Sequence, residues 1–257
     1  MCFPPEAVPP PVPESFLVTH DQPQGRAVEL TSGDGTTFSA AYALAPEPGG
    51  AGVLLLPDVR GLFDYYSNLA RSFAAAGHSA IVVDYFGRTA GTAARDPDFQ
   101  YMPHIKQTTP AQVQLDLRAA RQHLAEVSGA TSFVTVGFCF GGTQSYLATT
   151  DTELGLAGAV AFYGGLDETR LGVFPHPASE ARRMAGPILA LYGGADAGIT
   201  DELRNEFSIA LTDAGVDHEF VVYPGAPHSF FDRAHNDFTG ECTDAWQRTL
   251  RFLASVR

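Results

Sequence analysis

The sequence predicts an α/β protein with one mostly parallel sheet and helices on both of its faces. From residue 53 onward, short apolar runs alternate with segments whose apolar residues recur at helical spacing. These short runs show no polar–apolar alternation, which is typical of strands buried on both faces. Before residue 53 the residues do alternate, on either side of Gly33-Asp34-Gly35, which predicts an antiparallel N-terminal hairpin.

The N-terminal segment differs from the remainder of the chain. Residues 1–25, proline-rich over 1–13, are expected to form an extended arm on the surface, because proline continues neither a helix nor a central strand. Residues 26–257 show no break in composition and no repeat, so we expect a single domain without a large cap. The expected strands cover 26–30, 37–44, 53–56, 80–83, 134–138, 157–162, 188–192 and 219–223.

Helices are expected between these strands. Thr109 and Pro110 have the residue types of a helix cap and first turn, and the inner face that follows consists of Val113, Leu117, Ala120, Leu124 and Val127. Other helices are expected from about 63 to 76, directly after residue 139, from 200 to 214, and around Trp246. The stretch 85–108 reads as a long irregular connection, and connections of that length are usually functional.

Composition excludes several classes of function. A net charge of −13 argues against nucleic acid and anionic membranes as partners. The three widely spaced cysteines form no disulfide or zinc pattern, and no signal sequence or membrane-length apolar run is visible. We therefore expect a soluble, cytoplasmic monomer or small homo-oligomer that acts on a small molecule. The histidines have no metal-binding spacing and no glycine-rich dinucleotide loop follows a strand, so we expect no metal and no cofactor.

The most informative stretch is Gly137-Phe138-Cys139-Phe140-Gly141-Gly142, directly after a buried strand. A glycine two residues before and two residues after a cysteine is typical of a nucleophile elbow, a strained turn from strand to helix. The N-terminus of the following helix would stabilise a thiolate. The alternative is a buried structural cysteine beside a glycine turn.

Asp196 and His228 follow later strands, and the order Cys139, Asp196, His228 is that of the triad in an α/β-hydrolase. Cys139 would attack an acyl carbonyl, His228 would transfer the proton, and Asp196 would orient the imidazole. Backbone N–H groups of Phe140 and Val59 are the expected oxyanion donors. Taken singly, Asp196 could form only an Asx turn and His228 could be an ordinary loop residue.

These motifs, together with 57–61 (PDVRG), 84–88 (DYFGR) and 161–164 (AFYG), resemble the dienelactone hydrolase family over most of residues 26–256. The resemblance implies hydrolysis of enol lactones to open-chain keto acids, with Cys139, Asp196 and His228 as the triad. It implies that Arg88 binds the substrate carboxylate, with Arg60 a second candidate. Asp58 stands where the family commonly has a glutamate that contacts the resting thiol. Tyr163 is a further expected substrate-binding residue.

The leading hypothesis is therefore a cysteine hydrolase of a carboxylate-bearing ester or enol lactone that works through an acyl-thioester. A thioesterase or general carboxylesterase could use the same triad. A non-catalytic, redox-sensing thiol protein would need a resolving cysteine, for which Cys242 is the candidate.

Overall fold

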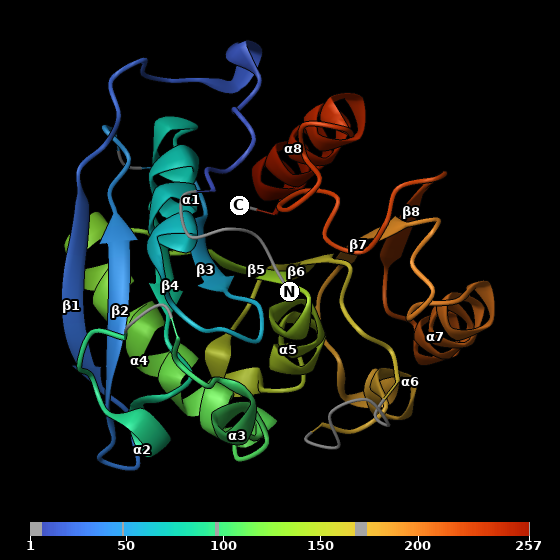
Figure 1. The fold of residues 1–257 in the computed structure, drawn as a ribbon, viewed down its shortest axis with the longest axis horizontal. Helices are drawn as coiled ribbons and strands as arrows, with labels where there is room; N and C mark the ends of the chain where they lie inside the picture. Colours follow the sequence, from blue (N-terminus) through green and yellow to red (C-terminus); the bar gives the residue numbers. More distant parts are fainter. Residues whose placement is uncertain (1–6, 48, 96–97, 168–173, 257) are drawn as a thin grey trace.

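The computed structural model describes residues 7–47, 49–95, 98–167 and 174–256. These residues form an eight-stranded sheet in the order β1-β2-β4-β3-β5-β6-β7-β8 (Figure 1). The strands are β1 (Gly25–Thr31), β2 (Thr37–Ala43), β3 (Gly52–Leu56), β4 (Ala80–Val83), β5 (Phe133–Phe138), β6 (Gly158–Phe162), β7 (Ile188–Gly193) and β8 (His218–Tyr223). β2 pairs antiparallel with β1 and β4, and all other neighbours are parallel. The predicted mostly parallel sheet with an antiparallel hairpin is confirmed.

Burial explains why the strands read as they do in the sequence. Every residue of β3, β4, β5, β6 and β7 is buried, because helices cover both faces of the sheet. β8 lies at the edge and is only partly buried. Figure 1 shows α1 (Asp64–Ala75) and α8 (Thr239–Ser255) on one face, and α4 (Pro110–Ser128), α5 (Phe140–Ala148) and α7 (Asp201–Ala214) on the other.

Helix α4 begins as its sequence predicts. The Thr109 side chain accepts a hydrogen bond from the Gln112 backbone, and the Gln112 side chain accepts one from the Thr109 backbone, forming a capping box. Val113, Leu117, Ala120 and Leu124 are buried, whereas Val127, which was expected on the inner face, is 37% exposed. Val127 lies in the last turn, where the helix end no longer packs against the sheet.

Two connections are more ordered than the sequence predicts. The stretch 85–108 contains two short helices, α2 (Gly87–Ala90) and α3 (Met102–Ile105), rather than irregular chain throughout. The described part of the N-terminal arm packs on the domain: the Trp246 indole N–H donates to the Pro10 carbonyl at 3.0 Å, and Val18 N–H donates to the Ala75 carbonyl at 2.9 Å. The arm thus adds to the packing of α1 and α8.

The parallel strands set the position of the functional loops. β3, β5, β6, β7 and β8 run in one direction, so the loops that follow them meet at one edge of the sheet. Within the described residues, no helix has the length and apolar character needed to cross a membrane.

Candidate active site

Cys139 is at the turn between β5 and α5, with φ 54° and ψ −114°. Its neighbours must be glycine for steric reasons: a Cβ on Gly137 would come within 2.0 Å of the Gly141 carbonyl oxygen, and one on Gly141 within 2.0 Å of the Leu56 carbonyl oxygen. The elbow therefore presses against the end of β3. The strained backbone projects the cysteine side chain out of the sheet at the start of a helix.

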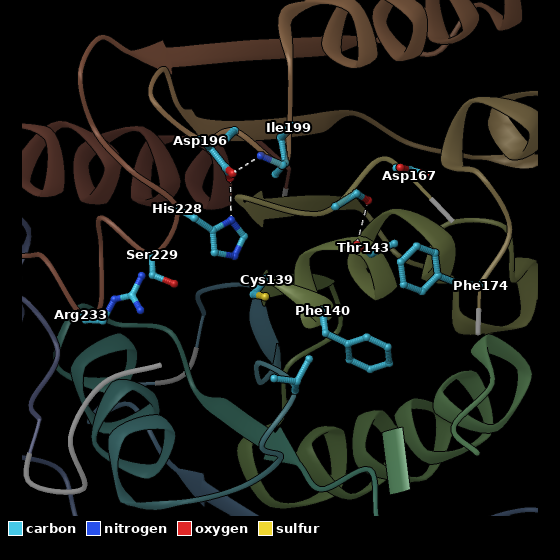
Figure 2. A pocket seen from close by; sticks show the side chains of 14 residues that line it. Cys139, Phe140, Thr143, Asp167, Phe174, Asp196, Ile199, His228, Ser229 and Arg233 are labelled. Carbon is cyan, nitrogen blue, oxygen red and sulfur yellow. Dashed lines mark hydrogen bonds and ion pairs between the residues drawn. The ribbon is translucent and has the colours of Figure 1, made fainter. Parts of the chain in front are cut away.

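The loops after β7 and β8 bring Asp196 and His228 together. Asp196 Oδ2 lies 2.6 Å from His228 Nδ1, and Asp196 Oδ1 accepts the Gly198 backbone N–H at 2.9 Å. The Asp196 carboxylate is almost fully buried, while the His228 side chain is 28% exposed. Because Nδ1 faces the carboxylate, the other ring nitrogen is directed to the cavity side, where Figure 2 also shows Cys139.

A cavity of about 470 Å³ joins these residues. Its lining residues are Val59, Cys139, Phe140, Thr143, Gly165, Asp167, Phe174, Asp196, Ala197, Gly198, Ile199, His228, Ser229 and Arg233. Five of the residues expected from the sequence thus share one cavity: Cys139, Asp196, His228, Phe140 and Val59 (Figure 2). A small organic molecule would fit in this volume.

Arg88 is placed differently from the expectation. Its Nη1 and Nη2 bind Asp116 Oδ2 and Oδ1 at 2.7 and 2.9 Å, and its Nε binds Asp34 Oδ2 at 2.9 Å. Asp116 is buried on α4, and a buried carboxylate needs such a partner. Arg88 does not line the cavity. The expectation that Arg88 reads the substrate carboxylate therefore finds no geometric support, since two carboxylates outside the cavity hold the guanidinium.

Asp58 and Arg60 bind each other. Asp58 Oδ1 accepts from the Arg60 backbone N–H at 2.8 Å and from Nε at 3.1 Å, and Asp58 Oδ2 accepts from Nη2 at 2.8 Å. The Arg60 guanidinium also lies 4.2 Å from the centre of the Phe63 ring. Neither residue lines the cavity, so the expected roles of Asp58 at the thiol and Arg60 at the substrate find no geometric support.

Tyr163 lies behind His228 rather than in the cavity. Its ring centre is 5.0 Å from that of the imidazole, and its hydroxyl donates to Asp232 Oδ2 at 2.8 Å. The side chain is fully buried, and burial raises the pKa of the phenol well above its usual value. Because the side chain is fully buried and does not line the cavity, the expectation that Tyr163 binds substrate finds no geometric support.

Several cavity residues were not identified from the sequence. Arg233 lines one side, five residues after His228, and Figure 2 shows its guanidinium near Ser229. Phe174 and Asp167 contribute to the opposite side, and Phe174 packs 6.2 Å from Phe140, ring centre to ring centre. A basic residue close behind the predicted base was the available signal for Arg233. Nothing in the local pattern distinguished Phe174 from a core residue.

A buried carboxylate, Asp232, directly precedes the cavity-lining Arg233 in the chain. Burial, followed by the charge of Asp58, raises the pKa of Asp232 to about 6. Among the described residues, no three His, Cys, Asp or Glu side chains are grouped so that they could hold a metal ion.

A protein-family model and several known proteins match most of this chain. The model of the dienelactone hydrolase family matches residues 38–257. A Salmonella typhimurium protein named "Putative carboxymethylenebutenolidase" is 29% identical over 255 residues, covering 95% of this chain and 92% of its own. A protein of the same name from Methylorubrum extorquens is 30% identical over 216 residues, covering 81% and 74%.

A solved structure extends the comparison to the fold. The "Putative Dienelactone Hydrolase from Klebsiella pneumoniae" superposes with a TM-score of 0.75 at 29% identity, covering 90% of this chain and 99% of its own. The match of a family model to most of the chain, on an α/β-hydrolase fold, shows that this protein is a hydrolase of lactone or ester bonds and belongs to the dienelactone hydrolase family.

Proposed function

We propose that this enzyme hydrolyses a carboxylate-bearing enol lactone or ester through a Cys139–His228–Asp196 triad and an acyl-thioester intermediate. The observation that carries the proposal is the 2.6 Å contact between Asp196 Oδ2 and His228 Nδ1 in a cavity that Cys139 also lines. That contact fixes the tautomer, so that the other ring nitrogen can exchange a proton with the thiol.

In the first half of the reaction, His228 takes the thiol proton and the Cys139 sulfur attacks the lactone carbonyl carbon. The ring C–O bond then breaks, and the imidazolium returns its proton to the leaving enol oxygen, which tautomerises to a ketone. The opened chain stays attached as a thioester. In the second half, His228 deprotonates water, which attacks the thioester carbonyl. The C–S bond breaks, the carboxylate product leaves, and Cys139 regains a proton.

Two backbone N–H groups are suited to bind the oxyanion. Phe140 is the first residue of α5, so its N–H has no partner within the helix, and Val59 borders the same cavity after β3. Neither N–H donates to a backbone carbonyl in the described part of the chain. The dipole of α5 adds a positive potential at the same place.

Arg233 takes over the role that the sequence suggested for Arg88. It is the arginine among the described residues that line the cavity, and a guanidinium matches a carboxylate with two parallel hydrogen bonds. Arg233 is in the same loop as His228. From there its guanidinium would bind the carboxylate end of the substrate while the carbonyl end lies over Cys139.

A second candidate is a general carboxylesterase or thioesterase using the same triad. The observation in its favour is the apolar part of the cavity wall, formed by Val59, Phe140, Phe174 and Ile199, which suits a neutral acyl or aryl group. The redox-sensing alternative has less support, because the Cys242 thiol is buried and donates to the Phe230 carbonyl at 3.5 Å. Burial raises the pKa of Cys242 to about 12, which disfavours thiol exchange. Cys2 lies outside the described residues.

The proposal predicts that Cys139→Ala abolishes hydrolysis of a panel containing a dienelactone, a neutral aryl ester and an acyl thioester. The matched control is Cys242→Ala, a buried cysteine outside the cavity, which should retain wild-type turnover. Mass spectrometry of rapidly quenched wild-type enzyme should detect the acyl adduct on the Cys139 peptide. Normal turnover by Cys139→Ala would exclude the mechanism, and the ranking of the three substrates separates the lactonase from the general esterase.

A further inference from the structure

A hydrogen bond that the proposed mechanism does not use lies directly behind the catalytic imidazole. The Tyr163 hydroxyl, from the loop after β6, donates to Asp232 Oδ2, from the loop after β8, at 2.8 Å. Both side chains are buried, at 0% and 1% exposure. The bond crosses over β7, whose own loop supplies Asp196. It therefore ties the loop that carries His228 to the loop after β6, across the loop that supplies Asp196.

The Tyr163–Asp232 pair contacts His228 in two ways. The Tyr163 ring lies against the imidazole at 5.0 Å between centres, with an interplanar angle of 56°. Asp232 closes the turn that carries the imidazole, because its N–H donates to the Ser229 carbonyl at 3.3 Å. Within the described residues, the non-glycine positions with positive φ are Cys139, Tyr163 and Ser229. A positive φ is unfavourable for these residues, so contacts with the surrounding structure must stabilise it. All three residues are at this site.

Asp232 also has an electrostatic link to His228. The charge of His228 lowers the pKa of Asp232, against the larger effects of burial and Asp58 that raise it. An ionised carboxylate at this place would attract the positive charge that forms on the imidazole during the reaction. The titratable or charged groups that act on Asp232, or on which it acts, are Asp58 after β3, Tyr65 and Tyr66 on α1, Tyr163 after β6, His228 in its own loop, and Cys242 on α8.

Fold stability alone gives no reason for a carboxylate at this place. Burial disfavours its charge, and an uncharged residue of the same shape would avoid that cost. We propose that Tyr163 and Asp232 form a positioning pair for His228, in which their hydrogen bond fixes the turn that carries the imidazole and the carboxylate stabilises the imidazolium formed when His228 takes the thiol proton. The inference rests on the proposed function, and neither residue touches substrate.

The test compares Tyr163→Phe, Asp232→Asn and the double variant. Asp232 Oδ1 also accepts the Arg233 backbone N–H. Asn can keep this contact through its oxygen and direct its amide towards the Tyr163 oxygen. We expect either single change to lower kcat by roughly tenfold with KM within about twofold. Asp232→Asn removes the charge that stabilises the imidazolium, and Tyr163→Phe removes the hydrogen bond that holds that charge in place, while the cavity lining is unchanged. The double variant should lose no more than the worse single variant, because the two residues act as a unit.

The pH dependence separates positioning from a structural effect. Removing the negative charge in Asp232→Asn should move the acid limb of the kcat/KM profile to lower pH. The pH profile for alkylation of Cys139 by iodoacetamide, measured without substrate by peptide mass spectrometry, should shift in the same direction. A nearby negative charge opposes the thiolate, so its removal favours reaction at lower pH.

A matched pair provides the control. The Tyr223 hydroxyl donates to Asp244 Oδ2 at 2.9 Å, linking β8 to α8, and neither residue lines the cavity. Tyr223→Phe and Asp244→Asn should leave kcat and both pH profiles unchanged. The inference is overturned if Asp232→Asn keeps the wild-type kcat and profiles, or if the two single losses add. Normal turnover by Cys139→Ala would instead overturn the proposed function, and the alkylation profile would still decide the role of Asp232.

Discussion

At the scale of single residues, the site depends on groups that the fold holds at a cost. Cys139 has a backbone conformation that L-residues rarely adopt, and Asp232 is a carboxylate with 1% of its surface exposed. The close approaches of Gly137 and Gly141 to neighbouring carbonyls make the first arrangement possible. Such strained or buried polar positions are typical of sites maintained for function rather than for stability.

The raised pKa of Asp232 makes a prediction about stability. Its folded-state pKa is about 6 against an ordinary value of 3.8, so the folded state binds more protons than the unfolded chain between these pH values. The wild-type free energy of unfolding should therefore fall as the pH rises through this window, by up to about 3 kcal/mol. Asp232→Asn lacks this loss, so its stability relative to wild type should rise from pH 4 to pH 6 and then level off.

Urea unfolding at a series of pH values measures this difference. Asp34→Asn is a control of opposite sign: Arg88 and Thr36 lower the pKa of Asp34 to about 2, so the favourable charge is present above pH 4 and lost below it. The Asp34 variant should therefore differ from wild type most at neutral pH. A constant difference between Asp232→Asn and wild type from pH 4 to pH 7 would show that Asp232 does not titrate as inferred.

At the scale of elements, Arg88 joins three parts of the fold. It lies in α2, binds the buried Asp116 on α4 through two nitrogens, and reaches Asp34 in the turn between β1 and β2. Ser32 also donates to Asp116. Arg88 thus fastens the turn of the antiparallel hairpin to α4. The role of Arg88 in the connection 85–108 is therefore structural, because the residue does not line the cavity.

Arg88→Ala should accordingly lower stability and spare substrate binding. Removing one partner of a buried ion pair leaves the Asp116 carboxylate uncompensated, which typically costs about 3 kcal/mol. The free energy of unfolding should fall by that order, while KM for an anionic lactone stays near the wild-type value. Arg183→Ala, which removes an exposed pair with Glu180, is the control and should cost less than about 1 kcal/mol. A large rise in KM specific to the anionic substrate would restore Arg88 as the carboxylate-binding residue.

At the scale of the whole molecule, the enzyme carries a net charge of −13, yet its proposed substrate is an anion. The global field repels such a substrate at long range, whereas Arg233 acts only within the cavity. Selection for the carboxylate must therefore come from a local contact.

Long-range repulsion and local attraction predict that added salt and the Arg233→Ala change have opposite effects on kcat/KM for an anionic substrate. Raising the ionic strength from about 10 to 150 mM shortens the screening length to about 8 Å, so kcat/KM for an anionic lactone should rise and that for a neutral ester should not. Arg233→Ala should lower kcat/KM for the anion by roughly tenfold and leave the neutral ester within about twofold. Steady-state kinetics with both substrates measures each effect. Equal losses on both substrates would mean that Arg233 does not bind the carboxylate.

The sequence by itself determined the class of fold and the residues of the proposed triad. Continuous apolar runs are a local consequence of strands buried on both faces, and the glycines around Cys139 are required by one sharp turn, so both can be read from short stretches. Parallel strands end at a common edge of the sheet, which predicts that the loops carrying Asp196 and His228 lie close to Cys139. These inferences need only local pattern and chain order.

Only the tertiary structure decided which charged and aromatic side chains reach the cavity. Arg88 lies in the short helix α2 and Arg233 in the loop after β8. Nothing near them in the sequence shows that a carboxylate on a distant helix binds Arg88 while Arg233 borders the active site. Tyr163 follows a strand end as expected but turns behind His228, because Asp232, 69 residues later, accepts its hydroxyl. Ion pairs and buried hydrogen bonds are chosen by contacts between segments far apart in the chain, and these contacts exist only once the sheet has assembled.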